Sequence, residues 1–148
     1  MKLIILTFIV ILSGCAANGP IYKPHVKSEL DTSIIYIYRP DRVVNCCVSP
    51  AVYINGKRLD SLKNAGYLVY EFPAGSFEIT VGDGSYGFEE QTIKIELQKN
   101  SSQYLKWVIG SINNFDMAAG YAPRNYHLIP IPIERANQEI SNLKLSKS

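Results

Sequence analysis

Apolar and polar residues alternate along short segments from residue 33 onward, and this alternation limits the folds open to the chain. Residues 76–81 and 92–97 show it most clearly, with isoleucine, leucine, valine or phenylalanine at every second position. A period of two places the apolar side chains on one face of a strand and the polar side chains on the other. Turn residues interrupt the pattern at short intervals, which is typical of antiparallel sheets with one solvated face.

Eight segments fit this description within about 100 residues, which is the density of strands found in a sandwich. We therefore predict a mainly β fold, an antiparallel β-sandwich of about seven or eight strands. The predicted strands cover residues 33–39, 51–54, 57–61, 67–72, 76–81, 92–97, 104–109 and 126–131.

Two turns organise these strands. Asn55-Gly56 separates two of them and suits a two-residue type I′ hairpin, which needs positive φ at both positions. Pro73-Ala74-Gly75 also has turn chemistry and predicts a second hairpin that leads into the strand at Phe77.

The end of the chain changes period. Apolar residues fall at Ile133, Ala136, Ile140 and Leu143, a spacing of three and four that predicts one C-terminal amphipathic helix over residues 133–146. Pro132 suits the residue before its first turn. The sequence therefore predicts one domain over residues 33–148, a sandwich with this helix packed against a sheet.

The first 14 residues have the pattern of a signal peptide. A single Lys2 precedes the apolar run 3–12, which ends in small residues. Ten residues are too few for a helix to cross a hydrocarbon layer of roughly 30 Å. We interpret residues 1–14 as a cleaved leader.

Leu12-Ser13-Gly14-Cys15 at the end of that leader resembles the lipobox of bacterial lipoproteins. The resemblance implies cleavage between Gly14 and Cys15, a diacylglyceryl thioether on the Cys15 sulfur and a third acyl chain, such as palmitate, on its amine. Such an anchor would hold the protein on a membrane effectively permanently. The alternative is an ordinary signal peptide with a chance cysteine at the cut.

The residue after the lipidated cysteine bears on location. Lipoproteins of Gram-negative bacteria with aspartate at this position are typically kept at the inner membrane, whereas this chain has Ala16. Assuming a Gram-negative source, the resemblance implies the outer membrane, with the body facing the periplasm. Residues 15–32 contain Asn18-Gly19-Pro20 and mixed charges without a period, so we interpret them as the lipidated cysteine and a flexible tether, which could reach roughly 55 Å. The body would then stand clear of the headgroups.

A wider resemblance covers roughly residues 33–145. Its motifs are Ile35-Tyr36-Ile37-Tyr38-Arg39-Pro40, Val52-Tyr53-Ile54-Asn55-Gly56-Lys57, Leu62-Lys63-Asn64-Ala65-Gly66-Tyr67, Pro73-Ala74-Gly75, Tyr104-Leu105-Lys106 and Glu139-Ile140. This ordered series resembles the bacterial lipoproteins grouped as domain of unknown function 2846. The Pro-x-Gly turn is also similar to PEGA-type and transthyretin-like sandwiches, which implies adhesion or assembly. No known activity follows from either resemblance.

Charge and motifs argue against several functions. The net charge of +2 gives no support for a nucleic-acid partner. The only histidines, His25 and His127, form no triad or metal pattern, so we predict no catalytic residues, no metal and no cofactor other than the covalent lipid. Residues 82–87 match G-x-G-x-x-G but lead into another predicted strand, so we interpret them as a hairpin loop.

Two groups of residues remain as candidate sites. Cys46-Cys47 allows a strained vicinal disulfide, two packed free thiols, or intermolecular pairing or metal binding. Tyr36, Tyr38 and Trp107 could form an exposed aromatic surface for a glycan or small ligand, although tyrosine and tryptophan are also ordinary strand residues.

We therefore expect a non-enzymatic periplasmic lipoprotein whose body is an interaction or envelope-structural module. Its expected partners are the membrane, reached through Cys15, and an envelope protein. The alternatives are ligand binding through the aromatic surface and, ranked lower, a thiol-based redox or metal role at Cys46-Cys47.

Overall fold

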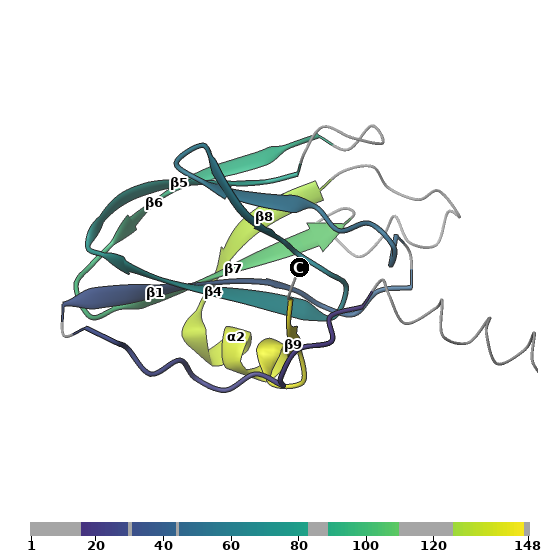
Figure 1. Cartoon of the computed structure of the whole chain (residues 1–148), viewed down its shortest axis with the longest axis horizontal. Coiled ribbons are helices and arrows are strands. Elements are labelled where there is room, and N and C mark those ends of the chain that lie inside the picture. The colour runs from purple at the N-terminus through teal and green to yellow at the C-terminus, as the bar shows by residue number, and fades with distance from the viewer. Residues whose placement is uncertain (1–15, 30, 44, 83–88, 110–125, 147–148) are drawn as a thin grey trace, which may run out of the picture.

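The computed structural model describes residues 16–29, 31–43, 45–82, 89–109 and 126–146. Its strands form two sheets that face each other, with one helix on the outside (Figure 1). This arrangement confirms the prediction of a β-sandwich with one C-terminal helix. The elements are β1 (Thr32–Arg39), β2 (Ala51–Ile54), β3 (Lys57–Ser61), β4 (Gly66–Pro73), β5 (Gly75–Val81), β6 (Gln91–Leu97), β7 (Ser102–Ile109), β8 (Tyr126–Ile131), α2 (Ile133–Ile140) and β9 (Lys144–Leu145).

One sheet has the strand order β8-β7-β1-β4-β9 and the other has the order β3-β2-β5-β6. Most neighbours are antiparallel, as the alternation predicts, but β1 pairs in parallel with β7 and β4 pairs in parallel with β9. Strand β1 therefore lies at the centre of the larger sheet, between β4 and β7. Every residue of β1 is buried, because both faces of that sheet are covered.

The turn at Asn55-Gly56 has the predicted form. Asn55 has φ 50° and Gly56 has φ 76°, and the flanking residues Ile54 and Lys57 pair directly. The left-handed conformation at both positions matches the twist of the strands that it joins.

The turn at Pro73-Ala74-Gly75 is not the predicted hairpin. Strand β4 pairs with β1 in the larger sheet, whereas β5 pairs with β2 and β6 in the smaller one. The bend therefore carries the chain from one sheet to the other. Turn chemistry specifies a change of direction but not which strand becomes the partner.

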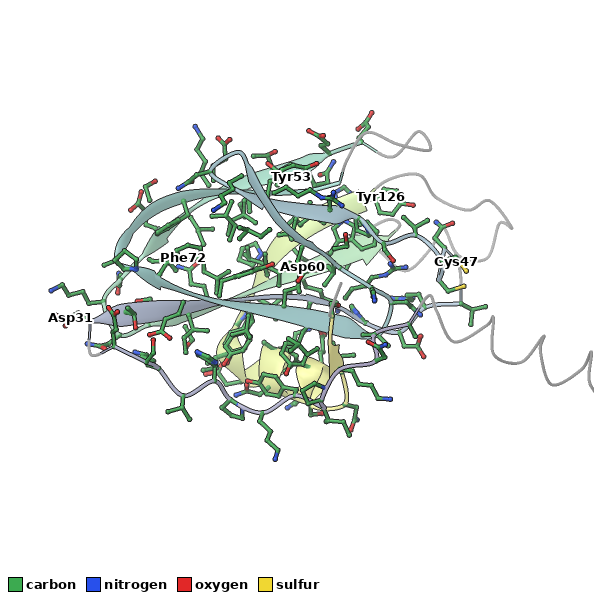
Figure 2. The ribbon with its side chains drawn as sticks, in the orientation of Figure 1. Asp31, Cys47, Tyr53, Asp60, Phe72 and Tyr126 are labelled. Carbon is green, nitrogen blue, oxygen red and sulfur yellow. The ribbon has the colours of Figure 1, made fainter. Side chains whose placement is uncertain are left out.

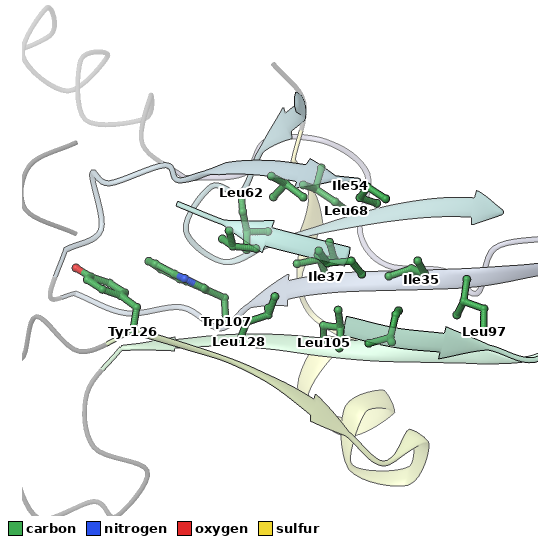
Figure 3. Close-up of a cluster of buried hydrophobic side chains, with 14 residues drawn as sticks. Ile35, Ile37, Ile54, Leu62, Leu68, Leu97, Leu105, Trp107, Tyr126 and Leu128 are labelled. Atoms are coloured by element: carbon green, nitrogen blue, oxygen red, sulfur yellow. The ribbon is translucent and has the colours of Figure 1, made fainter. Parts of the chain in front are cut away.

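The main core lies between the two sheets (Figure 3). It is formed by the inward residues of both sheets and by Leu62 of the β3–β4 connection. Its buried members are Ile35, Ile37, Val52, Ile54, Leu62, Leu68, Ile79, Val81, Ile95, Leu97, Leu105, Trp107, Tyr126 and Leu128.

A second hydrophobic cluster lies on the outer face of the larger sheet, beneath α2. The alternate residues of β1, namely Ile34, Tyr36 and Tyr38, pack there against Ala136 and Ile140 of the helix. The described residues therefore form three layers, two sheets and an outer layer that includes α2 (Figure 1).

The helix is shorter than the predicted 133–146. It ends at Ile140, and the chain turns so that Lys144 and Leu145 pair with Gly66 and Tyr67 as strand β9. Leu143 is still buried, as its place in the periodic pattern predicts, but it reaches the cluster from the turn. The hydrogen bonds that β9 gains explain why the helix does not continue.

Candidate functional site

The predicted anchor lies just before the part of the chain that the structure describes. Residues 1–14, including Gly14, and the lipidation candidate Cys15 fall outside the described residues. Ala16 is the first described residue. Among the described residues, no helix is long and apolar enough to cross a bilayer.

The segment that follows Cys15 differs from the expected tether. Ala16 forms a bridge with Asn64, and the Ala17 amide donates to the Asn64 carbonyl at 2.9 Å. Ala17 is only 5% exposed. The chain thus joins the folded body immediately after Cys15.

The same segment then runs beside β9. The Gly19 amide donates to the Leu145 carbonyl at 3.1 Å, and the Leu145 amide donates to Pro20 at 2.9 Å. A Cβ on Gly19 would lie 2.4 Å from the Leu145 carbonyl oxygen, so only glycine permits this approach. These contacts are backbone hydrogen bonds to residues far away in the sequence, so they impose no regular spacing of apolar side chains on the segment. The sequence of the segment therefore resembles that of a flexible tether.

Tyr22 packs the segment onto the sheet. Its ring meets Tyr36 and Tyr67 edge to face, with centroids 5.6 and 5.4 Å apart, and its hydroxyl lies 3.4 Å from that of Tyr104. Burial raises the pKa of Tyr36 to about 12, so the cluster stays neutral at physiological pH. These tyrosines act as packing groups.

Glu71 fixes the far end of the segment. Its carboxylate accepts hydrogen bonds from the hydroxyl of Thr32 and from the amides of Ser28 and Glu29, the last two at 3.0 and 3.2 Å. His25 lies 3.2 Å from the same carboxylate. The bond from Thr32 and those from the segment lower the pKa of Glu71 to about 2.

The proposed aromatic surface is wrong. Tyr36, Tyr38 and Trp107 are 2%, 0% and 2% exposed. The two tyrosines face the outer cluster and Trp107 faces the core between the sheets, so the three side chains lie on opposite faces of one sheet. The alternation of residues predicts which face of the strand each side chain lies on. It does not show that both faces of this sheet are covered by other parts of the chain.

Tyr38 instead takes part in a polar network under α2. Its hydroxyl donates to Glu139 at 2.8 Å, and Lys106 and Arg135 contact the same carboxylate at 2.7 and 2.9 Å. Burial raises the pKa of Glu139, but these three partners outweigh it and the pKa is lower than usual. The network joins the helix to β1 and β7.

Arg39 braces the turn that carries the cysteine pair. It is 1% exposed, lies 5.0 Å from the centre of the Trp107 ring, and donates to the carbonyls of Asn45 and Val48. Burial lowers its pKa to about 10, so it remains charged at neutral pH. Asn45, with φ 58°, also donates to the Tyr126 hydroxyl at 3.1 Å.

Cys46 and Cys47 are free thiols in this turn, with sulfur atoms 3.4 Å apart. Cys47 is exposed and Cys46 is partly buried. The hydrogen bond between the thiols raises the pKa of Cys46, and burial adds to this effect. Of the three arrangements considered for this pair, the structure describes the two free thiols.

The remaining motifs take structural positions. Strands β5 and β6, on either side of residues 82–90, pair antiparallel over Gly75–Val81, as a hairpin requires; residues 83–88 themselves lie outside the described part. His25 is in the N-terminal segment and His127 is in β8. The described residues hold no group of three or more metal-binding side chains.

A shallow groove of about 500 Å³ lies beside β7 and the end of β8. It is lined by Ser102, Gln103, Tyr104, Pro130, Ile131, Pro132 and Ile133. Its volume is within the range of small-ligand sites. None of the residues predicted as candidate sites lines it.

Sequence reasoning missed Arg39, Asn64 and Glu71, the three polar residues that position the N-terminal segment and the cysteine turn. Arg39 gave a usable signal, since an arginine directly follows the apolar and aromatic run 34–38. Asn64 and Glu71 gave none, because their partners come from residues 17 and 28.

Three comparisons relate the chain to known proteins. A family model described as "Protein of unknown function (DUF2846)" matches residues 29–120. A search of curated proteins finds no match. Among solved structures, the N-terminal domain of AlgF from P. aeruginosa aligns with 15% identity and a TM-score of 0.43, over 72% of this chain and 100% of that one.

Proposed function

The chain belongs to the DUF2846 family of proteins of unknown function, and from that premise we propose that it is a membrane-anchored lipoprotein with a non-catalytic body. Cys15 carries the diacylglyceryl and acyl chains, and cleavage after Gly14 makes it the mature N-terminus. The body then acts as an interaction or envelope-structural module on the periplasmic side of the outer membrane.

One observation carries the proposal: the folded body begins one residue after the lipobox cysteine. Ala16 is exposed and bridged to Asn64, and Ala17 is buried, so the described body begins at Ala16. A lipid on the adjacent cysteine would not disturb the core. The lipobox and the fold thus meet without a linker between them.

Anchoring on a surface favours weak contacts with other membrane proteins, because it raises the local concentration of both partners. A small body with no enzymatic role can therefore be effective as an assembly module. The packed tyrosines and the Glu139 network hold the outer layer to the larger sheet, which gives such a module a rigid body.

Metabolic labelling tests the anchor. Cells expressing the wild-type chain should incorporate labelled palmitate into it, and the Cys15→Ser variant should not. Cys47→Ser is the matched control, because it removes an exposed thiol and should leave labelling unchanged. Equal labelling of the wild type and Cys15→Ser would refute the proposal.

A thiol-based role at Cys46-Cys47 is the second candidate, favoured by the 3.4 Å separation of the two sulfur atoms and the exposure of Cys47. Metal analysis of the purified protein and a count of thiols under denaturing conditions test it. Bound metal, or fewer than two reactive thiols per lipidated chain, would support this role. Two reactive thiols without metal would refute it.

A further inference from the structure

We propose that the end of the sandwich around Asn64 faces the bilayer, and that Arg42 and Val43 there contact the phospholipid headgroups. This inference rests on the proposed lipidation of Cys15. It replaces a body that stands clear of the membrane with one held against it in a defined orientation.

The first step is the length of chain between lipid and body. A single Cα–Cα step of about 3.8 Å joins Cys15 to Ala16. Ala16 already forms a bridge with Asn64, and the Ala17 amide is bonded to the Asn64 carbonyl. Acyl chains on Cys15 therefore bring Asn64 to the membrane surface.

The second step is that the segment after Ala17 holds its position. Three backbone hydrogen bonds tie residues 19–22 to Leu143 and Leu145, and Glu71 holds Ser28 at the other end. Detaching this segment would expose Tyr22 and break the sheet-like pairing with β9. The distance between membrane and body is therefore fixed while the domain is folded.

The third step is what surrounds Asn64. Its side-chain oxygen accepts from the Arg42 amide at 3.1 Å, and its side-chain nitrogen donates to Asp41 at 2.7 Å. Val43 follows directly and is 92% exposed. Residues 41–43 thus lie at the same end of the sandwich as Ala16.

The chemistry of this end fits a lipid surface. An exposed valine can enter the boundary between headgroups and acyl chains, and a cation beside it can meet lipid phosphates. Arg42 is exposed, and Lys63 directly precedes Asn64 in the chain, so two basic residues accompany Asp41 around Asn64. Cys47 lies at this end and Asp31 at the opposite end (Figure 2).

The geometry also supplies a control position. Asp31 precedes β1 and Arg42 follows it, so the two are separated by the length of an eight-residue strand, roughly 26 Å. The Asp31 side chain is 74% exposed. A probe at Asp31 should therefore remain in water while a probe at Val43 touches lipid.

The test uses the full lipidated chain in vesicles of phosphatidylethanolamine and phosphatidylglycerol at 3:1. Cys46→Ser and Cys47→Ser remove the other thiols, and Val43→Cys or Asp31→Cys carries an environment-sensitive fluorophore. We expect a headgroup spin-labelled lipid to quench the probe at 43 severalfold more than the probe at 31. Equal quenching, or stronger quenching at 31, would overturn the proposed orientation.

Flotation of the same samples separates the two claims. If the chain floats with the vesicles but both probes are quenched equally, the proposed orientation is wrong and the anchor is supported. If the chain does not float, both the orientation and the anchor are wrong. Inserting ten Gly/Ser residues between Ala16 and Ala17 should lower quenching at 43 to the level at 31. Unchanged quenching would contradict the role of the short connection.

Discussion

The Ala17 amide donates a 2.9 Å hydrogen bond to the carbonyl of Asn64, a residue 47 positions later in the chain. This contact places the start of the folded body next to Cys15. Residues 16–29 are therefore part of the folded domain and not a flexible tether. The predictions below concern the residues that hold this arrangement together.

Asn64→Ala should lower the free energy of unfolding by about 1–3 kcal/mol, because the Asn64 side chain is 5% exposed and holds both Asp41 and the Arg42 amide. Denaturant titration measures the change, and hydrogen exchange should be faster at Arg42. Asn142→Ala, at an exposed position, is the control. A loss no greater than that of the control would contradict the role of Asn64.

Glu71 should make the N-terminal segment sensitive to acid. Its pKa in the folded protein, about 2, is below its ordinary 4.5, so the charged carboxylate stabilises the fold above pH 4.5. This contribution is lost as the pH falls from 4.5 through about 2. Carboxyl NMR titration should report the low pKa directly, and the amides of Ser28 and Glu29 should lose their protection over the same range.

Glu71→Gln removes that pH dependence and should leave Ser28 and Glu29 poorly protected even at pH 7. Glu96→Gln, at an exposed position on β6, should behave as the wild type. A Glu71 pKa near 4.5 would show that the carboxylate does not hold the segment.

Arg39→Met keeps an apolar stem over Trp107 but removes the donors to Asn45 and Val48. We expect a loss of roughly 2–4 kcal/mol in unfolding free energy and faster reaction of Cys46 and Cys47 with a thiol reagent. Arg58→Met on β3 is the exposed control and should change stability by about 0.5 kcal/mol or less. Unchanged stability and thiol reactivity would mean that Arg39 does not brace the turn.

Glu139→Gln leaves the Lys106 ammonium, 11% exposed, without its carboxylate partner. Since Glu139 itself is 22% exposed, solvent reduces the effect, and we expect a loss of about 1–3 kcal/mol. The lowered pKa of Glu139 implies that the stabilisation is present at neutral pH and is lost on acidification. Glu134→Gln, exposed in the first turn of α2, should be nearly neutral in thermal denaturation.

Strands β1 to β8 were predictable because most are short apolar segments bounded by turn residues, whereas the residues of β9 were predicted as helix. The β2–β3 hairpin followed from Asn55-Gly56, whose positive φ angles few other pairs adopt. The destination of β5 after Pro73 and the end of α2 at Ile140 were not predictable, since both depend on pairing with strands distant in sequence.

The candidate site also has one part that could be predicted from the sequence and one part that could not. The lipobox is a local motif and can be read from adjacent residues, whereas the attachment of Ala17 to Asn64 is a backbone contact that no side-chain pattern reports. Tyr36, Tyr38 and Trp107 were predicted as one candidate surface because alternation reveals neither the opposite sheet that buries Trp107 nor the outer layer that buries the two tyrosines. That layer includes α2 and Tyr22, and the latter belongs to the segment interpreted as a tether.

The most direct measurement is the intact mass of the protein purified from its native membrane, with fragmentation of its N-terminus. The account predicts a chain that begins at Cys15 and carries a diacylglyceryl group on sulfur and an acyl chain on the amine. A chain that still begins at Met1, or that begins at Cys15 with an unmodified sulfur and amine, would contradict it.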